Sequence, residues 1–298
     1  MQLRGTFTAI VTPFTPDGEH VDFAALDALV EAQIAGGVSG LVPCGTTGEA
    51  PTLSEEEQVQ VIERVVQVAK RRVAVLAGTG SFSTKKTIAA SKAAMAAGAD
   101  GVMLVMPYYS KPSQEGLRQH VLAVAKAVPA PIVLYNIPSR CIIDLSAETT
   151  ARICEAAPNV VGLKDATGNV LRCQELSRML GDRLAILCGD DGLTVPMMSV
   201  GATGVISVTS NVRPREVSEV TRRFLAGDLA GARALHFSLL PVHAAMFLEP
   251  NPAPAKALLA AEGRMSPAVR LPLAPASEAV LAQVKAALAK LSEGSRAS

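Results

Sequence analysis

The sequence predicts an α/β protein built as a (β/α)8 TIM barrel with a C-terminal helical extension. Eight short runs rich in apolar and β-branched residues recur along the chain, and each is followed by a segment of helical length. The main alternative is a doubly wound sheet, but no GxGxxG motif follows the first run and no GxxxxGK[ST] motif occurs. The chain has 298 residues, of which 49% are hydrophobic and 18% charged, so it can bury a large core. Eight βα units favour closure of the sheet into a barrel.

The eight expected strands are nearly continuous apolar runs, as in a parallel sheet covered on both faces. They occupy residues 7–11, 40–42, 73–77, 101–106, 132–135, 160–164, 185–188 and 204–207. Three of the intervening helices carry clear start signals. Residues 54–57 resemble a capping box, Ser83 or Thr84 opens the third helix, and Ser113 opens the fourth.

The segment after the eighth strand predicts further helices. Residues 213–226 fit the eighth barrel helix, and 229–247, 255–262 and 277–291 fit a helical extension interrupted by proline-rich stretches. We therefore divide the chain into a catalytic barrel, residues 1–226, and a C-terminal helical extension, residues 227–298. The extension has no obvious chemistry, and we expect it to serve packing or subunit assembly.

Charge and composition point to small-molecule substrates. The 28 basic and 27 acidic residues give a net charge of +1, which offers no electrostatic reason to expect nucleic acid or a membrane surface as partner. No apolar run approaches the roughly 18 residues of a membrane span. These features leave small molecules as the default partners.

The cysteines and histidines show no metal-type spacing. An odd number of cysteines without CxxC and without a signal peptide predicts reduced thiols in a cytoplasm, each best interpreted as buried and inert. The cysteines are Cys44, Cys141, Cys154, Cys173 and Cys188, and the histidines are His20, His120, His236 and His243. None of the histidines ends a strand, so we expect no metal site.

Lys164 is the first candidate for catalysis. It ends the apolar run 160–163 and precedes the polar turn 165–168, so its root should be buried and its tip should open into a pocket. Partial desolvation favours the neutral amine, which is the form that attacks a carbonyl. Taken alone, a solvated strand-end lysine is the simpler interpretation, so other residues must decide.

The tyrosines support a shared site. The chain has only Tyr108, Tyr109 and Tyr135, and each lies at the end of an expected strand. A half-buried tyrosine can occur wherever its ring finds a partner, so this clustering becomes strong evidence only if the strands are neighbours.

A barrel would bring further side chains to the same mouth, because reactive groups gather at the C-terminal ends of its strands. The residues expected there are Thr46, Thr47, Tyr109, Tyr135, Arg140, Lys164, Gly189 and Ile206. The turn 45–49 offers N–H groups and two hydroxyls that could hold a carboxylate or relay a proton, or it could be an ordinary glycine turn. Arg140 could bind a second carboxylate, or it could simply be solvated.

Several motifs in one order resemble a known family. They are Gly-Thr-Thr-Gly-Glu at 45–49, Pro-Tyr-Tyr at 107–109, Tyr-Asn-Ile-Pro-Ser-Arg at 135–140, Gly-Leu-Lys-Asp-Ala-Thr-Gly at 162–168 and Gly-Val-Ile-Ser-Val at 204–208. Residues 248–252 and 270–273 also match. Together they resemble the dihydrodipicolinate synthase and N-acetylneuraminate lyase superfamily along nearly the whole chain, and most closely its synthase branch.

The resemblance implies a reaction. Lys164 would form a Schiff base with pyruvate, whose carboxylate the Thr46–Thr47 turn would hold, and Tyr135 would transfer protons. Thr47 and Tyr109 would complete a proton relay, Tyr109 reaching in from a partner subunit. The enamine would attack aspartate semialdehyde held by Arg140 and give 4-hydroxy-tetrahydrodipicolinate, a step of lysine and diaminopimelate biosynthesis. The resemblance further implies a homotetramer that is a dimer of dimers. It also implies a reaction without a cofactor, because the iminium is the electron sink.

Two departures from the family pattern affect specificity. Cys141 and Ile142 follow Arg140 where relatives commonly have Thr-Gly, which leaves the acceptor less secure. In the region resembling the lysine-feedback pocket, Lys86 accompanies Glu55, Gln58 and Phe82 near Tyr108. A cation there would repel the amine of a lysine ligand, so we expect weak or absent feedback inhibition.

Two rival functions remain open from the sequence. One is a pyruvate-dependent aldolase, lyase or dehydratase acting on a 2-keto-3-deoxy sugar acid, which would keep Lys164 and Tyr135 but not need Arg140. The other is a non-catalytic metabolite-binding or assembly protein, which would form no pyruvate adduct at Lys164.

Overall fold

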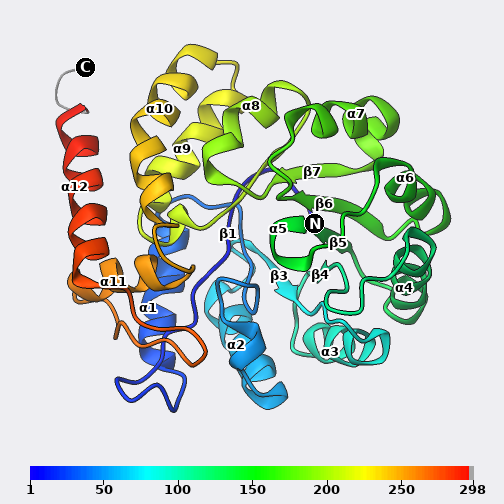
Figure 1. The fold of residues 1–298 in the computed structure, drawn as a ribbon, viewed down its shortest axis with the longest axis horizontal. Coiled ribbons are helices and arrows are strands. Elements are labelled where there is room, and N and C mark those ends of the chain that lie inside the picture. The colour runs from blue at the N-terminus through cyan, green and yellow to red at the C-terminus, as the bar shows by residue number, and fades with distance from the viewer. Residues whose placement is uncertain (295–298) are drawn as a thin grey trace.

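The computed structural model, which describes residues 1–294, confirms the predicted barrel (Figure 1). Eight parallel strands pair in chain order, and β8 pairs with β1 to close the sheet. The strands are β1 (Gly5–Thr8), β2 (Gly40–Leu41), β3 (Ala74–Gly78), β4 (Gly101–Val105), β5 (Ile132–Asn136), β6 (Val160–Asp165), β7 (Ala185–Cys188) and β8 (Gly204–Ser207).

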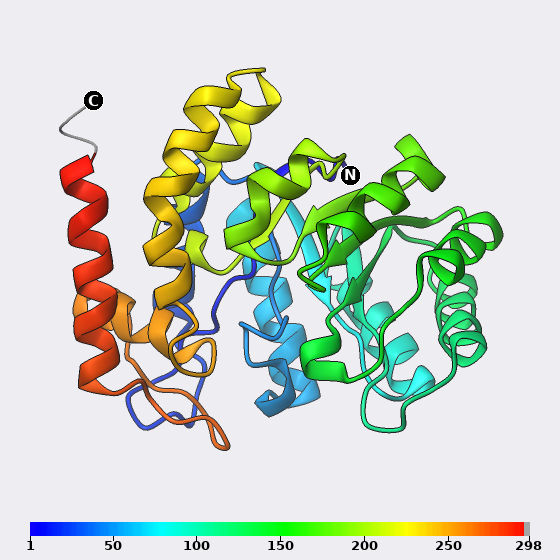
Figure 2. The same ribbon diagram turned by 45° about the horizontal axis from the view of Figure 1, so that its top comes forward.

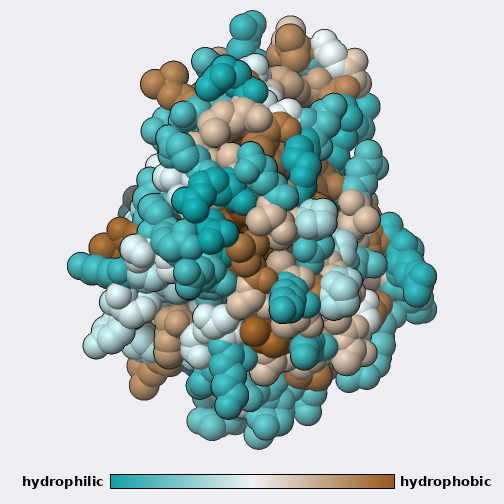
Figure 3. All heavy atoms as spheres, turned by 90° about the vertical axis from the view of Figure 1, so that its right-hand side faces the viewer, coloured by the Kyte–Doolittle hydropathy of each residue, from teal (hydrophilic) through white to brown (hydrophobic). Residues whose placement is uncertain are grey.

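Helices follow the strands in turn and surround the barrel (Figure 1). They are α1 (Phe23–Ala35), α2 (Glu55–Ala69), α3 (Thr84–Ala96), α4 (Gln114–Ala127), the short α5 (Pro138–Cys141), α6 (Ala147–Ala156), α7 (Val170–Leu180), α8 (Thr194–Ser199) and α9 (Pro214–Leu225). Four 3-10 turns are η1 (Ala50–Thr52), η2 (Gly181–Arg183), η3 (Asp191–Leu193) and η4 (Thr209–Asn211). Figure 3 shows the side formed by the middle of the chain, where hydrophilic side chains cover most of the surface.

The predicted helix starts are confirmed. Ser54 caps α2, and its side chain and that of Glu57 exchange hydrogen bonds with each other's backbone N–H groups in a full capping box. Ser83 caps α3 and Ser113 caps α4. In each, only the serine side chain takes part, by accepting a hydrogen bond from a backbone N–H of the first turn. These caps satisfy N–H groups that a helix leaves unpaired at its first turn.

The first strand differs from its predicted range of 7–11. Its ladder with β8 runs from Gly5 to Thr8. Beyond it, the backbone N–H of Val11 bonds the side-chain oxygen of Asn211 instead of a strand. The N–H groups of Ala9 and Ile10 still bond the carbonyls of Ser207 and Val42, so η4 replaces a strand partner only at Val11.

Large and small residues interlock inside the barrel. A Cβ on Gly40 would lie 2.3 Å from the Phe7 ring, and one on Gly162 would lie 2.5 Å from Leu3. Gly40 and Gly162 therefore leave space for the side chains of Phe7 and Leu3 inside the barrel. The side chains of Tyr135 and Ile206 belong to the same interior cluster.

The C-terminal extension forms three helices beside the barrel (Figures 1 and 2). They are α10 (Leu229–Ala245), α11 (Ala253–Ala261) and α12 (Glu278–Gly294). Helix α10 packs on α9 and α12, and α11 packs on α12. Because α9 and α10 are in broad contact, the boundary between residues 226 and 227 stays a prediction. Within residues 1–294, no helix has the length and apolar character needed to cross a membrane.

Candidate active site

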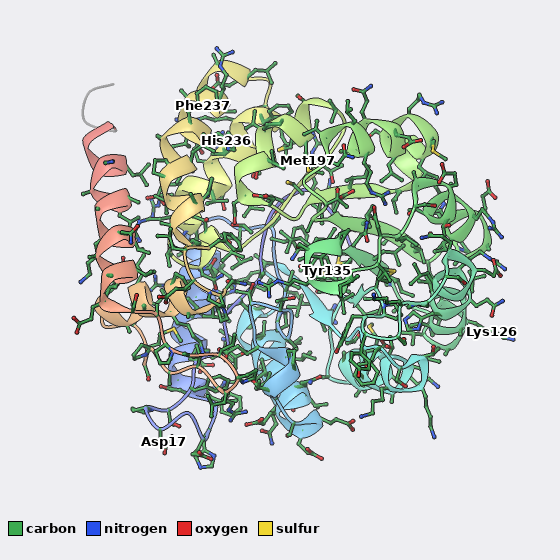
Figure 4. The ribbon with its side chains drawn as sticks, viewed as in Figure 1. Asp17, Lys126, Tyr135, Met197, His236 and Phe237 are labelled. Carbon is green, nitrogen blue, oxygen red and sulfur yellow. The ribbon has the colours of Figure 1, made fainter. Side chains whose placement is uncertain are left out.

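Lys164 and Tyr135 lie side by side at the C-terminal ends of β6 and β5. They are partners in the β5–β6 register, and Lys164 Nζ lies 4.1 Å from the centroid of the Tyr135 ring. Both side chains are buried, with 5% of Lys164 and 4% of Tyr135 exposed. The expectation of an open lysine tip was therefore wrong for this chain, because the amine folds over the phenol ring. Figure 4 labels Tyr135 near the middle of the molecule, far from α12.

Asp165 follows Lys164 in the sequence but faces the other way, as strand alternation requires. Its Oδ2 accepts from Arg172 Nε at 3.1 Å, and its Oδ1 accepts from the Thr167 hydroxyl at 2.6 Å. Both members of the Arg172–Asp165 pair are buried. The carboxylate is thus committed to Arg172 and is not the counterion of the Lys164 amine.

The turn 45–49 after β2 is also held from several sides. Thr46 is half-buried, whereas Thr47 is 3% exposed. The hydroxyl of Thr12 donates to the Gly48 carbonyl at 2.7 Å, and Glu49 adopts a positive φ of 56°. A left-handed glutamate is strained, so the surroundings must hold it there.

A cavity of about 950 Å³ opens beside these residues. Thr46, Tyr135 and Arg140 line it. Arg140 is exposed on α5 and makes no ion pair with any residue the structure describes, so its guanidinium is free for an anionic ligand. This size suits a small-molecule site.

Ile206 lies in β8 and Gly189 directly follows β7, and neither lines the cavity. Ile206 is 1% exposed and packs in the same interior cluster as Tyr135. Gly189 follows β7, and a Cβ there would lie 2.6 Å from the Cβ of Ala166. A glycine therefore lets the loop after β7 approach the loop after β6.

Thr47 and Tyr109, which were expected to complete the proton relay, do not line the cavity that Tyr135 lines. Tyr109 lies at the surface. It is 92% exposed and has a φ of 67°. Its neighbour Tyr108 is half-buried and packs edge-to-face on Phe82, with ring centroids 5.4 Å apart. Burial raises the pKa of Tyr108. A role for Tyr109 therefore depends on a second chain.

All five cysteines are free and buried. Cys141 lines the cavity, and burial raises the pKa of its thiol, with Arg140 opposing that effect. A raised pKa means little thiolate at neutral pH, so the structure agrees with an inert Cys141.

The residues proposed for the lysine-feedback pocket line the same cavity. Glu55, Gln58, Phe82 and Lys86 lie along it together with Tyr108. The cavity therefore extends from Tyr135 and Arg140 to the region where α2 and α3 begin.

Sequence reasoning missed three residues of the extension that contact the site. Asn251 Nδ2 donates to Thr47 Oγ1 at 2.9 Å, and Lys256 Nζ donates to Glu49 Oε1 at 2.5 Å. The backbone N–H of Arg270 donates to Glu49 Oε2 at 3.0 Å. The resemblance of segments 248–252 and 270–273 to the family was the available signal for Asn251 and Arg270, and no quoted motif includes Lys256.

Comparisons with known proteins show the family. The sequence model of the Dihydrodipicolinate synthetase family matches residues 2–291. The 4-hydroxy-tetrahydrodipicolinate synthase of Sorangium cellulosum is 75% identical over 291 residues, covering 98% of this chain and 97% of the relative. That of Nitratidesulfovibrio vulgaris is 50% identical over 275 residues, covering 92% of this chain and 94% of the relative.

Solved structures show the same similarity. The 4-hydroxy-tetrahydrodipicolinate synthase of Methylacidiphilum fumariolicum SolV superposes with a TM-score of 0.96 at 45% identity, covering 98% of this chain and 97% of the other. A chloride-inhibited dihydrodipicolinate synthase of Acinetobacter baumannii, solved with pyruvate, has a TM-score of 0.95 at 44% identity and covers 98% and 99%.

Proposed function

The chain belongs to the dihydrodipicolinate synthetase family, and we propose from this premise how its residues perform the family's reaction. The activity is that of a 4-hydroxy-tetrahydrodipicolinate synthase, a pyruvate-dependent lyase that condenses pyruvate with L-aspartate 4-semialdehyde. The observation that carries the catalytic assignment is the buried Lys164 amine beside the Tyr135 phenol at the barrel's C-terminal end. A buried amine at that end of a barrel is suited to attack a carbonyl.

In the first half of the reaction, Lys164 Nζ attacks C2 of pyruvate to give a carbinolamine. Tyr135 supplies the proton with which the carbinolamine oxygen leaves as water, and the iminium remains. The Thr46–Thr47 turn holds the pyruvate carboxylate with backbone N–H and hydroxyl donors. Gly189 and Ile206 border the bound substrate.

In the second half, C3 of the adduct gives a proton to the Tyr135 phenolate and becomes the nucleophilic carbon of an enamine. That carbon bonds to the aldehyde carbon of aspartate semialdehyde, whose carboxylate Arg140 binds and whose carbonyl oxygen takes the proton from Tyr135. The amine of the acceptor then attacks the C2 iminium, which releases Lys164 and the cyclised product. The iminium serves as electron sink, so the reaction needs no cofactor.

We extend the proposal to assembly and location. Thr47 and Tyr109 relay protons with Tyr135, and Tyr109 acts from a neighbouring subunit, which its 92% exposure in a single chain supports. A dimer of dimers would supply that neighbour to every site. Five free cysteines support a reducing compartment, the cytoplasm.

The test measures pyruvate-dependent consumption of aspartate semialdehyde, coupled to a reductase that oxidises NADPH. Wild type should turn over and Lys164→Ala should not. Borohydride reduction with pyruvate should add mass at Lys164 in wild type alone. An adduct without turnover would retain the Schiff base and point to a sugar-acid acceptor, whereas no adduct in folded wild type would refute the assignment of Lys164.

A further inference from the structure

The turn 45–49 is anchored by the C-terminal extension through the side chain of Glu49. Glu49 is 1% exposed, and both oxygens of its carboxylate bond residues of the extension. One oxygen accepts from the Lys256 ammonium, and the other accepts from the backbone N–H of Arg270. The extension therefore holds a turn that lies more than 200 positions earlier in the chain.

The anchored residue is bonded to the part of the turn that lines the cavity. Gly45 and Thr46 line this cavity together with Tyr135. The backbone N–H of Glu49 donates to the Thr46 carbonyl at 3.1 Å, and that of Ala50 donates to the Gly45 carbonyl at 3.3 Å. The positions of Gly45 and Thr46 therefore depend on the backbone at Glu49.

The backbone of Glu49 is strained, so it needs an anchor. Its φ of 56° lies in the left-handed region, which glycine adopts freely and glutamate does not. Without an anchor, relaxation toward the ordinary α or β region would move its N–H away from the Thr46 carbonyl. The side-chain bonds of Glu49 therefore help to keep this N–H directed at Thr46.

Both groups that anchor Glu49 are themselves fixed. Lys256 is fully buried and also donates to the Ala268 carbonyl at 2.8 Å, and its Nζ lies 4.1 Å from the Phe14 ring centroid. The Arg270 guanidinium donates at 2.7 Å to each oxygen of Glu57, in the first turn of α2. A carboxylate bound by two such donors has little freedom to move.

Stability alone does not explain why this pair is charged. Burial lowers the pKa of Lys256 to about 8, with the Glu49 carboxylate acting in the opposite direction. A buried ion pair gains little net stability, and apolar side chains of similar volume are often as stable in its place. The pair does provide a defined geometry, because few arrangements satisfy both charges and the Arg270 N–H.

We propose that Glu49 is a positioning residue for pyruvate, held by Lys256 and Arg270 so that the turn 45–49 presents its donors to the pyruvate carboxylate. It acts through the backbone of Gly45 and Thr46 and touches no substrate itself. The inference rests on the proposed role of this turn as the carboxylate site. It gives the extension a part in substrate binding in addition to packing.

The first test uses Lys256→Met in the full chain, which removes the ammonium and keeps most of the side-chain volume. The pyruvate concentration that half-saturates the Lys164 adduct, trapped with borohydride and measured by mass, should rise about 10- to 100-fold. The value of kcat/KM for pyruvate should fall to a similar extent. That for aspartate semialdehyde should change less than about 3-fold, because the acceptor meets an adduct already bonded to Lys164 and is held by Arg140. Partial unfolding would instead lower both values of kcat/KM equally.

A double variant separates positioning from stability. Glu49→Gln places an amide NH2 group opposite a donor, where a carboxylate oxygen had accepted. Glu49→Gln and Lys256→Met alone each leave a buried charge without its partner, so each should melt at a lower temperature than wild type. The double variant leaves neither charge and should melt above both single variants, while its half-saturating pyruvate concentration should stay at least about 10-fold above wild type. A return of this concentration to the wild-type value together with the melting temperature would show a role in stability alone and overturn the inference.

Asn159→Ala is the control for a loss of stability away from the turn, because this amide donates to the carbonyls of Ala125, Val128 and Ala130 beside the start of β6. It should lower the melting temperature and leave the half-saturating pyruvate concentration unchanged. An unchanged concentration in Lys256→Met, with the adduct forming in wild type, would overturn the inference and leave the proposed function standing. No adduct in folded wild type would refute the proposed function, and the inference would fall with it.

Discussion

Lys164 and Asp165 are neighbours in sequence with separate roles, because successive side chains of a strand point to opposite faces. The lysine points into the barrel and lies over Tyr135. The aspartate points to the helix layer, where Arg172 and Thr167 bind it. The Asp165 carboxylate is therefore the partner of Arg172 and not of the Lys164 amine.

Arg172→Leu should destabilise the fold by about 3–5 kcal/mol, because it leaves the buried Asp165 carboxylate without its cation. The matched control is Arg152→Leu, which breaks an exposed pair with Glu115 and should cost at most about 1 kcal/mol. Urea unfolding of wild type and both variants would measure the difference. Equal losses of unfolding free energy in the two variants would contradict the structural role of the Arg172–Asp165 pair. The folded fraction of Arg172→Leu should still form the pyruvate adduct.

At this scale, the sequence predicted that Lys164 and Tyr135 end neighbouring strands and that Thr46 and Arg140 follow strands, because strand ends and turns are local features. It could not predict the partners of Thr47 and Glu49. Asn251 and Lys256 reach them from another part of the chain, and nothing in their local pattern encodes that contact. The pairing of Asp165 with Arg172 was not predictable either. The sequence around Asp165 is compatible with a carboxylate in a buried ion pair and equally with one exposed to solvent.

Among the elements, all eight strands and the helix caps were predictable, because each depends on a short run of residues. The ends of β1 were not, because they depend on its pairing with β8 and, beyond Thr8, on Asn211 of η4. Helix α10 was predicted over 229–247 and runs from Leu229 to Ala245, but the contact between its two histidines was not predictable. Its His236 and His243 ring centroids lie 5.9 Å apart, and Figure 4 shows His236 and Phe237 on this helix with Met197 of α8 nearby.

The histidines of α10 predict a loss of stability in acid. Burial lowers the pKa of both His236 and His243, with His243 adding to the effect on His236, whose Nδ1 has no partner among the described residues. Below about pH 6.5 the unfolded chain binds protons on these rings while the folded chain keeps them neutral. The free energy of unfolding should therefore fall as pH decreases from about 6.5, by up to about 1.4 kcal/mol per pH unit for each ring.

His236→Leu should make this pH dependence shallower, and His20→Leu, which changes an exposed ring, should leave it as in wild type. Unfolding in urea at several pH values between 7.5 and 5 would measure the slopes. A slope unchanged by His236→Leu would contradict the prediction.

At the scale of the whole molecule, one cavity joins Thr46, Tyr135 and Arg140 to the first turns of α2 and α3. Lys86 is exposed there and adds a cation to the lining. A lysine ligand would bring a second ammonium close to it, and like charges repel at short range. We expect L-lysine to inhibit weakly or not at all, with no clear effect below about 1 mM.

Lys86→Glu should increase sensitivity to lysine, and Lys85→Glu controls for the change of net charge on the same helix. Initial rates over a lysine titration would test this. Strong inhibition of wild type at micromolar lysine would contradict the prediction and show that the carboxylates of Glu55 and Glu56 in the same cavity outweigh Lys86.

The last prediction concerns the assembly, because an exposed Tyr109 can join the relay only from another subunit. If two chains exchange this residue, Lys164→Ala and Tyr109→Phe damage different components of each site. Mixing the two inactive proteins under conditions that allow subunit exchange should restore about a quarter of wild-type activity, since random pairing of two-fold related chains leaves that share of sites intact. The control is a mixture of Tyr108→Phe with Lys164→Ala. Its activity should equal that of the Tyr108→Phe chains it contains, with no gain on mixing. If the Tyr109→Phe mixture shows no more than the sum of its parents although mixed oligomers have formed, Tyr109 does not act across the interface, and the exposed phenol would need another role.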